Sequence, residues 1–309
     1  MSDVLTELRA IGEETRLRLL VLLSHGELTV ANLTSILGQS QPRISRHLKI
    51  LTEAGVVERY PEGAQVMCRV SKAQQHQALF TSILDRIDPA QSPYSRDLKA
   101  LETLIKDREQ EAERYFEDHA TDWDSIRSLY VEEAKIEAAL LDLAGNRQFR
   151  QQLDLGTGTG RLIDLFKSRT DSAVGVDNNK AMLSIARSRL NPDKDDTVDI
   201  RHAHIESLPE ALRNTSDLIT IHLVLCYVTE PLSVLRQAIQ AMTDDGCLLL
   251  ADFCPHDIED LRKERAHRRL GFSQNEIRHW AFETGLAVTD YKILKGNKLD
   301  VFVARLEKK

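Results

Sequence analysis

The stretch Gln152-Leu-Asp-Leu-Gly-Thr-Gly-Thr-Gly-Arg161 decides the fold of the larger part of this chain. Its apolar start predicts a strand, which ends in a glycine-rich turn and is followed by a helix. The three glycines, Gly156, Gly158 and Gly160, permit a tight turn and a close approach of the backbone to a ligand. The unpaired N–H groups at the start of the helix favour a negatively charged group at the same place.

A second predicted strand, Ala173-Val-Gly-Val-Asp177, ends in an acid. A carboxylate at the end of that strand suits a ribose, because it can accept hydrogen bonds from both ribose hydroxyls. Helices and strands continue to alternate after it. The expected helices are 180–190 and 231–242, and the expected strands are 198–202, 217–225, 247–253, 287–294 and 301–306. This order predicts an α/β domain with a doubly wound, mostly parallel sheet.

The bulk composition agrees with a globular protein of two domains. The chain has 309 residues, of which 42% are hydrophobic and 29% are charged, and this length exceeds that of one small domain. The net charge of −7 argues against a globally basic nucleic-acid-binding protein, although one recognition helix needs only a few positive side chains. The chain has no long apolar run and no leader pattern, so we expect a cytoplasmic protein without membrane association. Four scattered cysteines predict no disulfide framework.

Residues 17–26 predict an amphipathic helix that a glycine closes, and residues 29–55 then predict a pair of helices joined by a short turn. Thr29 can cap the first helix, Gly38 interrupts the chain, and Ser40 can begin a second helix that stops at Gly55. The second helix has an apolar face, formed by Ile44, Leu48 and Leu51. Its other face is polar and basic. Residues 57–70 then predict a β-hairpin, so the order is that of a winged helix-turn-helix.

The segment SQPRISRHLKILTEAGVVERYPEGAQVMCRV, residues 40–70, closely resembles the winged-helix domain of the ArsR family of bacterial repressors. The resemblance covers about residues 3–87. It implies a homodimer whose two recognition helices bind a palindromic operator in double-stranded DNA. It also implies that the contacts to bases and phosphates come from Ser40, Gln41, Arg43, Ser45, Arg46 and His47.

Many members of that family sense a metal through a cysteine pair on the helix before the turn. The matching residues 27–33 contain no cysteine, and Cys68 stands alone in the hairpin. A metal site needs several converging ligands. We therefore expect no metal here and interpret Cys68 as a small buried hydrophobe.

The middle of the chain is predicted to be helical. We expect one helix over residues 71–87 at the dimer interface, a linker at 88–93, and a long charged helix over 95–118. Tyr115, His119 and Trp123 either cover the small-molecule site as a lid or simply pack against the sheet. The expected domains are therefore a winged helix-turn-helix at 1–90, a helical linker and lid at 91–145, and a cofactor-binding domain at 146–309.

A glycine motif alone also occurs in NAD-binding folds. Here the motif LDLGTGTGR, the acid followed by Asn178-Asn-Lys-Ala-Met-Leu183, and the order of the later strands together resemble the Rossmann-like class I S-adenosylmethionine-dependent methyltransferases. The resemblance covers about residues 115–309. It is strongest to small-molecule methylases that carry an ArsR-type domain in front. It implies S-adenosylmethionine or S-adenosylhomocysteine as the ligand, with NAD as the alternative.

This resemblance assigns the cofactor-binding residues by their position in the motifs. Those around the methionine part are Asp154, Gly156, Thr157, Gly158 and Gly160. Those around the ribose and the adenine are Asp177, Asn178, Met182, His204 and Ile205. His204 stands where the family usually has an acid, and His222 with Leu223 would line the donor-methyl end.

Methyl transfer mainly requires that donor and acceptor are positioned, and a base is needed only if the acceptor must lose a proton. The candidate catalytic residues are His222 and Tyr227, with His256 and His267 as further histidines that can equally be structural. The motif typical of DNA-base methylation is absent after the strand at 217–225. Cys226, Cys247 and Cys254 give no clear converging set for arsenite methylation.

Two functions remain open. In the first, the chain is a transcriptional repressor whose C-terminal domain binds S-adenosylmethionine or S-adenosylhomocysteine and thereby modulates operator binding. In the second, that domain is an active small-molecule methyltransferase with an autoregulatory DNA-binding domain. A fold of this type hosts both functions. We favour the first, because the cofactor-side residues are complete and the acceptor-side chemistry is indistinct.

Overall fold

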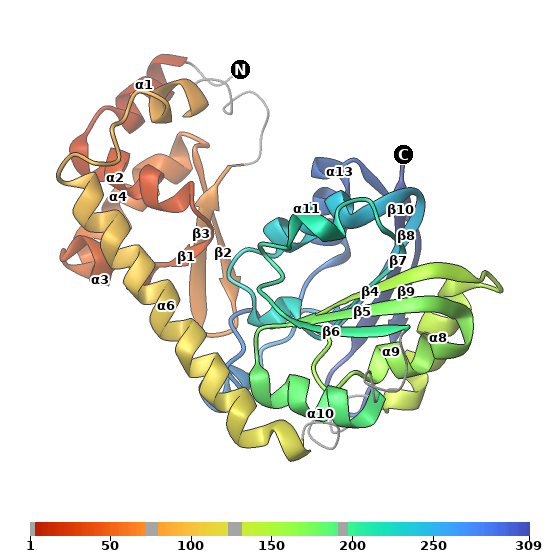
Figure 1. Cartoon of the computed structure of the whole chain (residues 1–309). Helices are drawn as coiled ribbons and strands as arrows, with labels where there is room; N and C mark the ends of the chain where they lie inside the picture. Colours follow the sequence, from red (N-terminus) through yellow and green to blue (C-terminus); the bar gives the residue numbers. More distant parts are fainter. Residues whose placement is uncertain (1–3, 72–79, 123–131, 191–196) are drawn as a thin grey trace. The chain divides into compact units, whose positions relative to one another are not determined.

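The structure is a computed structural model that describes residues 4–71, 80–122, 132–190 and 197–309. The chain divides into two compact units, Met1–Gln110 and Glu111–Lys309 (Figure 1). Within the described ranges, no helix is both long enough and apolar enough to cross a membrane.

The first unit combines helices with a small antiparallel sheet of strand order β1-β3-β2. Its elements are α1 (Val4–Ile11), α2 (Glu14–Leu23), β1 (Leu28–Thr29), α3 (Val30–Leu37), α4 (Gln41–Glu53), β2 (Val57–Glu62) and β3 (Gln65–Val70). The Thr29 hydroxyl accepts from the N–H of Asn32 and so caps α3, as expected from the sequence. Gly38 ends α3 in the left-handed conformation, with φ +62°. The predicted helix pair and hairpin are both present.

An apolar core holds α2, α3 and α4 together. It includes the fully buried side chains Leu19, Leu20, Leu33, Ile44, Leu48 and Leu51. Cys68 is also buried in this core, in agreement with its interpretation as a small hydrophobe, and burial raises the pKa of its thiol to about 11. Of the helix expected over 71–87, residues 72–79 lie outside the described residues, and residues 80–84 are helical.

The long charged helix predicted over 95–118 is α6 (Tyr94–His119). Its first turns pack on the first unit, where Arg18 donates two hydrogen bonds to the buried carboxylate of Asp97, at 2.6 and 2.8 Å. Leu101 of the same helix lies in the core of that unit. The boundary between the two compact units therefore falls inside α6, and residues 88–93 belong to the first unit.

The second unit contains a seven-stranded sheet of order β6-β5-β4-β7-β8-β10-β9. The strands are β4 (Phe149–Leu155), β5 (Thr170–Asp177), β6 (Val198–His202), β7 (Ser216–His222), β8 (Met242–Phe253), β9 (Leu286–Leu294) and β10 (Val301–Lys308). Strands β6, β5, β4, β7 and β8 pair in parallel, whereas β10 is antiparallel to both β8 and β9. The sheet is therefore mostly parallel, as predicted.

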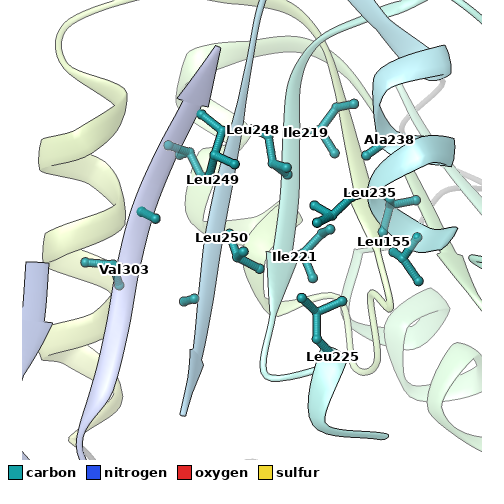
Figure 2. Close-up of a cluster of buried hydrophobic side chains, with 14 of the residues drawn as sticks. Leu155, Ile219, Ile221, Leu225, Leu235, Ala238, Leu248, Leu249, Leu250 and Val303 are labelled. Carbon is teal, nitrogen blue, oxygen red and sulfur yellow. The ribbon is translucent and has the colours of Figure 1, made fainter. Parts of the chain in front are cut away.

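Helices cover both faces of this sheet, which makes the domain doubly wound (Figure 1). One face carries α8 (Glu133–Ala144), α9 (Arg161–Phe166) and α10 (Lys180–Leu190), and the other carries α11 (Pro231–Ala241) and α13 (Gln274–Glu283). Short helical segments complete the unit: η1 (Ala120–Asp122), η2 (Lys167–Arg169), η3 (Glu210–Leu212), η4 (Leu225–Tyr227) and α12 (Asp260–Glu264). Figure 2 shows Leu235 and Ala238 of α11 extending toward Ile221 and Ile219 of β7 in the buried core.

The structure corrects the expected end of the strand at 217–225. Strand β7 ends at His222, and Leu223 takes a φ of +53°, which turns the chain out of the sheet. Residues Leu225–Tyr227 then form the short helix η4. The turn is held by Asp252 at the end of β8, whose carboxylate accepts from the N–H of Leu225 at 2.9 Å.

Candidate functional site

The glycine-rich turn lies between β4 and α9 and folds over the end of β5. The N–H groups of Gly156 and Thr157 both donate to the carbonyl of Val176, at 2.8 and 3.0 Å. Gly156, Gly158 and Gly160 have φ values of +74°, +52° and +80°, a conformation that side chains disfavour. The turn therefore has a backbone conformation that glycine adopts with little strain and that other residues at these positions would adopt only with strain.

Two of the three glycines also make room for neighbouring side chains. A Cβ atom on Gly156 would lie 2.5 Å from a methyl group of Val224, and one on Gly160 would lie 2.7 Å from a methyl group of Leu190. Val224 directly follows β7, and Leu190 ends α10. Gly156 therefore allows the segment after β7 to close over the turn, and Gly160 allows α10 to pack against it.

Asp177 closes the other side of the turn at the carboxyl end of β5. One carboxylate oxygen accepts from the N–H of Gly158 at 2.9 Å, and the other accepts from the N–H of Asn179 at 2.8 Å. Burial raises the pKa of Asp177, against the effect of these two hydrogen bonds. The acid and the glycine turn, which the sequence associates with one ligand, are therefore in direct contact.

Asp154 and Thr157 are the buried polar members of the predicted set. Asp154 is 3% exposed and accepts from the Thr220 hydroxyl at 2.6 Å, which links β4 to β7. Thr157 is 5% exposed, and among the described residues its hydroxyl has no hydrogen-bond partner. The turn thus contains a buried polar atom that a bound ligand could satisfy.

The residues predicted around the adenosine differ in exposure. Asn178 and His204 are exposed, and Ile205 is half-buried against the core of the sheet. Met182 is 2% exposed and packs in a cluster with Tyr115 and Ala120. Met182 is thus covered by the end of α6 and the segment after it.

Sequence reasoning missed Asn179, which is 2% exposed. Its side-chain carbonyl accepts from the N–H of Met182 at 3.0 Å, and its side-chain NH2 donates to the carbonyl of Glu113 in α6 at 3.2 Å. The position directly before a predicted helix is the signal that could have identified the first role, because asparagine is a preferred N-cap. The contact with Glu113 leaves no signal in the local sequence.

The two candidate catalytic residues lie near different partners. His222 is buried at the end of β7, and its Nε2 lies 3.8 Å from a carboxylate oxygen of Glu133. Tyr227 is half-buried in η4, and its hydroxyl lies 3.2 Å from Nε2 of His267. His267 was only a secondary candidate in the sequence, yet the structure brings it into contact with Tyr227.

Of the three aromatic residues expected either to form a lid or to pack against the sheet, the structure describes two. Tyr115 is buried, and its hydroxyl accepts from Arg265 at 3.0 Å. The imidazole of His119 lies beside it, with ring centroids 4.4 Å apart. Trp123 lies outside the described residues. Tyr115 and His119 thus pack together on the second unit next to Met182.

The predicted DNA-contacting residues lie at the start of α4, the second helix of the helix-turn-helix. Ser40, Gln41, Arg43 and Arg46 are exposed, and Ser45 is half-buried. His47 is placed differently, because its side chain is only 12% exposed and its Nδ1 lies 3.4 Å from the carboxylate of Glu13. The exposed face of α4 thus carries the two arginines, whereas His47 faces α2.

Comparison with known proteins assigns the two parts of the chain to different families. Residues 13–59 match the bacterial regulatory proteins of the arsR family, and residues 146–293 match the methyltransferase domain family. The arsenical resistance operon repressor of Escherichia coli is 45% identical over 64 residues, which are 20% of this chain and 55% of the repressor. The ubiquinone/menaquinone biosynthesis C-methyltransferase of Escherichia fergusonii is 35% identical over 127 residues, which are 40% of this chain and 50% of that enzyme.

The chain thus spans about half the length of each of these curated relatives. Among solved structures, a SAM-dependent methyltransferase from Leishmania major superimposes with a TM-score of 0.53, covering 64% of this chain and 82% of the other. Its sequence identity is 21%, so this likeness shows the fold. The chain thus joins a segment that matches the arsR family of bacterial regulatory proteins, residues 13–59, to a segment that matches the methyltransferase domain family, residues 146–293.

Proposed function

We propose that this protein is a DNA-binding repressor whose methyltransferase domain binds S-adenosylmethionine or S-adenosylhomocysteine and thereby changes its affinity for operator DNA. The exposed basic face of α4 supports the DNA-binding half of this proposal. A recognition helix reads base edges in the major groove with such side chains, and two copies in a homodimer fit a palindromic site.

The chemistry of the glycine turn supports the choice of ligand. Asp177 offers a carboxylate to the two ribose hydroxyls, and the glycine-rich turn that contacts it is the kind of backbone that a ligand can approach closely. The Thr157 hydroxyl, buried and without a partner among the described residues, offers one more hydrogen bond there. The residues present therefore fit S-adenosylmethionine, which when bound supplies an activated methyl group.

The observation that carries the regulatory proposal is a pair of contacts that Arg108 and Glu113 make from neighbouring turns of α6. In the first unit, Arg108 donates to the side-chain carbonyl of Asn32 at 3.0 Å, and Asn32 forms the capping box of α3. In the second unit, Glu113 accepts from Asn179, whose N–H is bound to Asp177. One continuous helix therefore contacts both the helix that precedes α4 and the neighbour of the predicted ribose-binding acid.

Such a helix offers a physical route for coupling two ligands. If the ligand at Asp177 shifts Asn179, the turn of α6 that contains Glu113 responds, and the preceding turn of α6 contacts the capping box of α3 through Arg108. Coupling between two binding sites typically amounts to about 1–3 kcal/mol, or about 5–150-fold in affinity. The coupling is reciprocal, so DNA should change the affinity for the small ligand by the same factor.

Calorimetric titration of the full chain tests this proposal. The protein is titrated with S-adenosylmethionine and with S-adenosylhomocysteine, alone and in the presence of its own promoter fragment. Micromolar binding that changes when the DNA is present supports the regulator. Binding that is indifferent to DNA contradicts coupling and favours the second candidate, an active small-molecule methyltransferase. The contact between Tyr227 and His267, beside the predicted cofactor site, is the observation in favour of that alternative.

A further inference from the structure

A cluster of rings lies at the carboxyl edge of β7 and β8, next to the predicted cofactor site. Tyr227 of η4 packs edge-to-face on Phe116 of α6, with ring centroids 4.8 Å apart. It packs in the same way on His267, at 4.9 Å, and His267 lies 5.5 Å from Phe253, the last residue of β8. Ligands of parallel α/β domains bind outside the carboxyl ends of the strands, which is where these rings lie.

The same cluster adjoins residues predicted to hold the cofactor. Tyr227 and Phe116 pack against the group of side chains that contains Met182. Val224, three residues before Tyr227, lies against Gly156 of the glycine turn. A molecule bound among the rings would therefore lie beside the cofactor.

His267 is held rigidly at this place. The two N–H groups that follow it, those of Arg268 and Arg269, donate to the carbonyl of Cys226 at 2.8 and 3.1 Å. Its Nε2 is bound to the Tyr227 hydroxyl. His267 is only 4% exposed, and among the described residues its Nδ1 has no hydrogen-bond partner. A buried nitrogen without a partner is costly, and a ligand with a hydrogen-bonding group would satisfy it.

The charges around His267 restrict which ligand fits. Burial lowers the pKa of His267 to about 3, and the neighbouring His256, Arg262 and Arg265 act in the same direction. The imidazole is therefore neutral at pH 7, with one nitrogen committed to Tyr227 and one left for a ligand. The nearby arginines disfavour a cationic ligand and favour an acidic hydroxyl group.

We propose that Phe116, Tyr227, Phe253 and His267 bind a flat hydroxylated aromatic molecule, whose hydroxyl group pairs with Nδ1 of His267. The rings of Phe116 and Tyr227 are half-buried, and a flat aromatic molecule that packs beside them gains aromatic contacts. This inference rests on the proposed cofactor-binding function, because it places the second ligand beside S-adenosylmethionine or its product.

The test compares two probes, 2-naphthol and naphthalene, which differ only in the hydroxyl group. Each is titrated by fluorescence into the full-length protein saturated with S-adenosylhomocysteine. We expect 2-naphthol to bind about tenfold more tightly than naphthalene, as one additional buried hydrogen bond implies. In the His267→Phe variant, we expect this preference to disappear, while the affinity for naphthalene remains.

If His267 has only a structural role, His267→Phe should change the affinities for 2-naphthol and naphthalene by the same factor. An unchanged ratio of these two affinities in His267→Phe therefore overturns the proposal. Phe116→Ala should weaken the binding of both probes equally. Phe282→Ala truncates a ring that is 62% exposed and should change the binding of neither probe.

Titration of each variant with S-adenosylhomocysteine separates the aromatic-site proposal from the cofactor proposal. If His267→Phe binds it normally but keeps the naphthol preference, only the aromatic site is refuted. If the wild-type protein does not bind it, the cofactor proposal fails first.

Discussion

The side-chain amide of Asn179 joins two elements that are distant in sequence, because it donates to the carbonyl of Glu113 in α6 and accepts from the first turn of α10. Its own N–H donates to Asp177. A single residue thus connects the predicted ribose-binding carboxylate to the helix that continues into the first unit. The proposed regulation depends on this connection.

Replacing Asn179 with serine should separate ligand binding from its effect on DNA. Serine is an effective N-cap and can still accept from the N–H of Met182, but it is too short to reach Glu113. We expect Asn179→Ser to bind S-adenosylhomocysteine within about threefold of wild type, since the cap contributes only about 1 kcal/mol. The change in operator affinity on adding the ligand should shrink several-fold, as measured by fluorescence anisotropy of labelled promoter DNA. A full response in this variant would show that the signal does not pass through the contact with Glu113.

Removing the carboxylate of Asp177 should abolish tight cofactor binding. Two hydrogen bonds from ribose hydroxyls to a charged acceptor contribute about 3 kcal/mol or more in total. We therefore expect Asp177→Ala to lose about 100-fold or more in affinity for S-adenosylmethionine in calorimetry. Asp199→Ala, which removes an exposed acid of the adjacent strand, is the matched control. Normal ligand-dependent operator release by Asp177→Ala would rule out the sensor function at this site.

Gly156 should be sensitive to substitution for two separable reasons. Alanine there must adopt a φ of +74° and also collides with Val224, whereas Gly145→Ala meets a φ of +66° with no atom within 4 Å of the new Cβ. We expect Gly145→Ala to cost about 1 kcal/mol of the free energy of unfolding, and Gly156→Ala to cost about 1–3 kcal/mol more. Thermal unfolding measures both. Val224→Ala should recover part of the second loss, and no recovery would show that the collision is not the cause.

The exposed arginines of α4 should dominate DNA binding in the first unit. Removing Arg46 deletes one positive charge from the exposed face of the predicted recognition helix, so we expect Arg46→Ala to weaken operator binding about tenfold. If this side chain contacts a phosphate, the slope of log affinity against log salt should fall by about 1. Arg86→Ala removes an exposed arginine outside α4 and should leave both quantities unchanged. Equal losses in the two variants would indicate a general charge effect instead of recognition by α4.

Much of the fold could be predicted because its signals are local. The Thr29 cap, the glycines after Leu155 and the acid at the end of β5 all lie beside the elements that they define. Short, nearly continuous apolar runs that alternate with helices along the chain then indicated the parallel strands, because such strands are buried on both faces of the sheet.

The remaining features depend on contacts between residues that are distant in sequence. The apolar run after His222 suggested a longer strand, but the carboxylate of Asp252 binds the N–H of Leu225 and favours a turn there. The local pattern cannot show this, since Leu223 is an unusual residue at a positive φ. The pairing of Tyr227 with His267 across 40 residues was hidden for the same reason.

The buried histidines should make the second unit sensitive to acid. Unfolded His267 takes up a proton near its ordinary pKa of 6.5, whereas the folded residue stays neutral until its lowered pKa of about 3. Between these values the unfolded state binds more protons, so stability falls as the pH falls through this window. Between pH 7 and pH 5, the expected loss is about 2 kcal/mol. His256, with a pKa lowered to about 4, acts in the same direction.

Denaturant unfolding of the second unit at pH 7 and at pH 5 measures this loss. His267→Phe keeps a ring of similar size but removes the titrating group, so its stability should fall by about 2 kcal/mol less than that of wild type over the same interval. His202→Gln, which changes an exposed histidine of the same unit, is the control and should retain the wild-type dependence. An unchanged slope in His267→Phe would mean that this imidazole is already protonated in the folded protein near pH 5. Such a result would contradict the lowered pKa of His267.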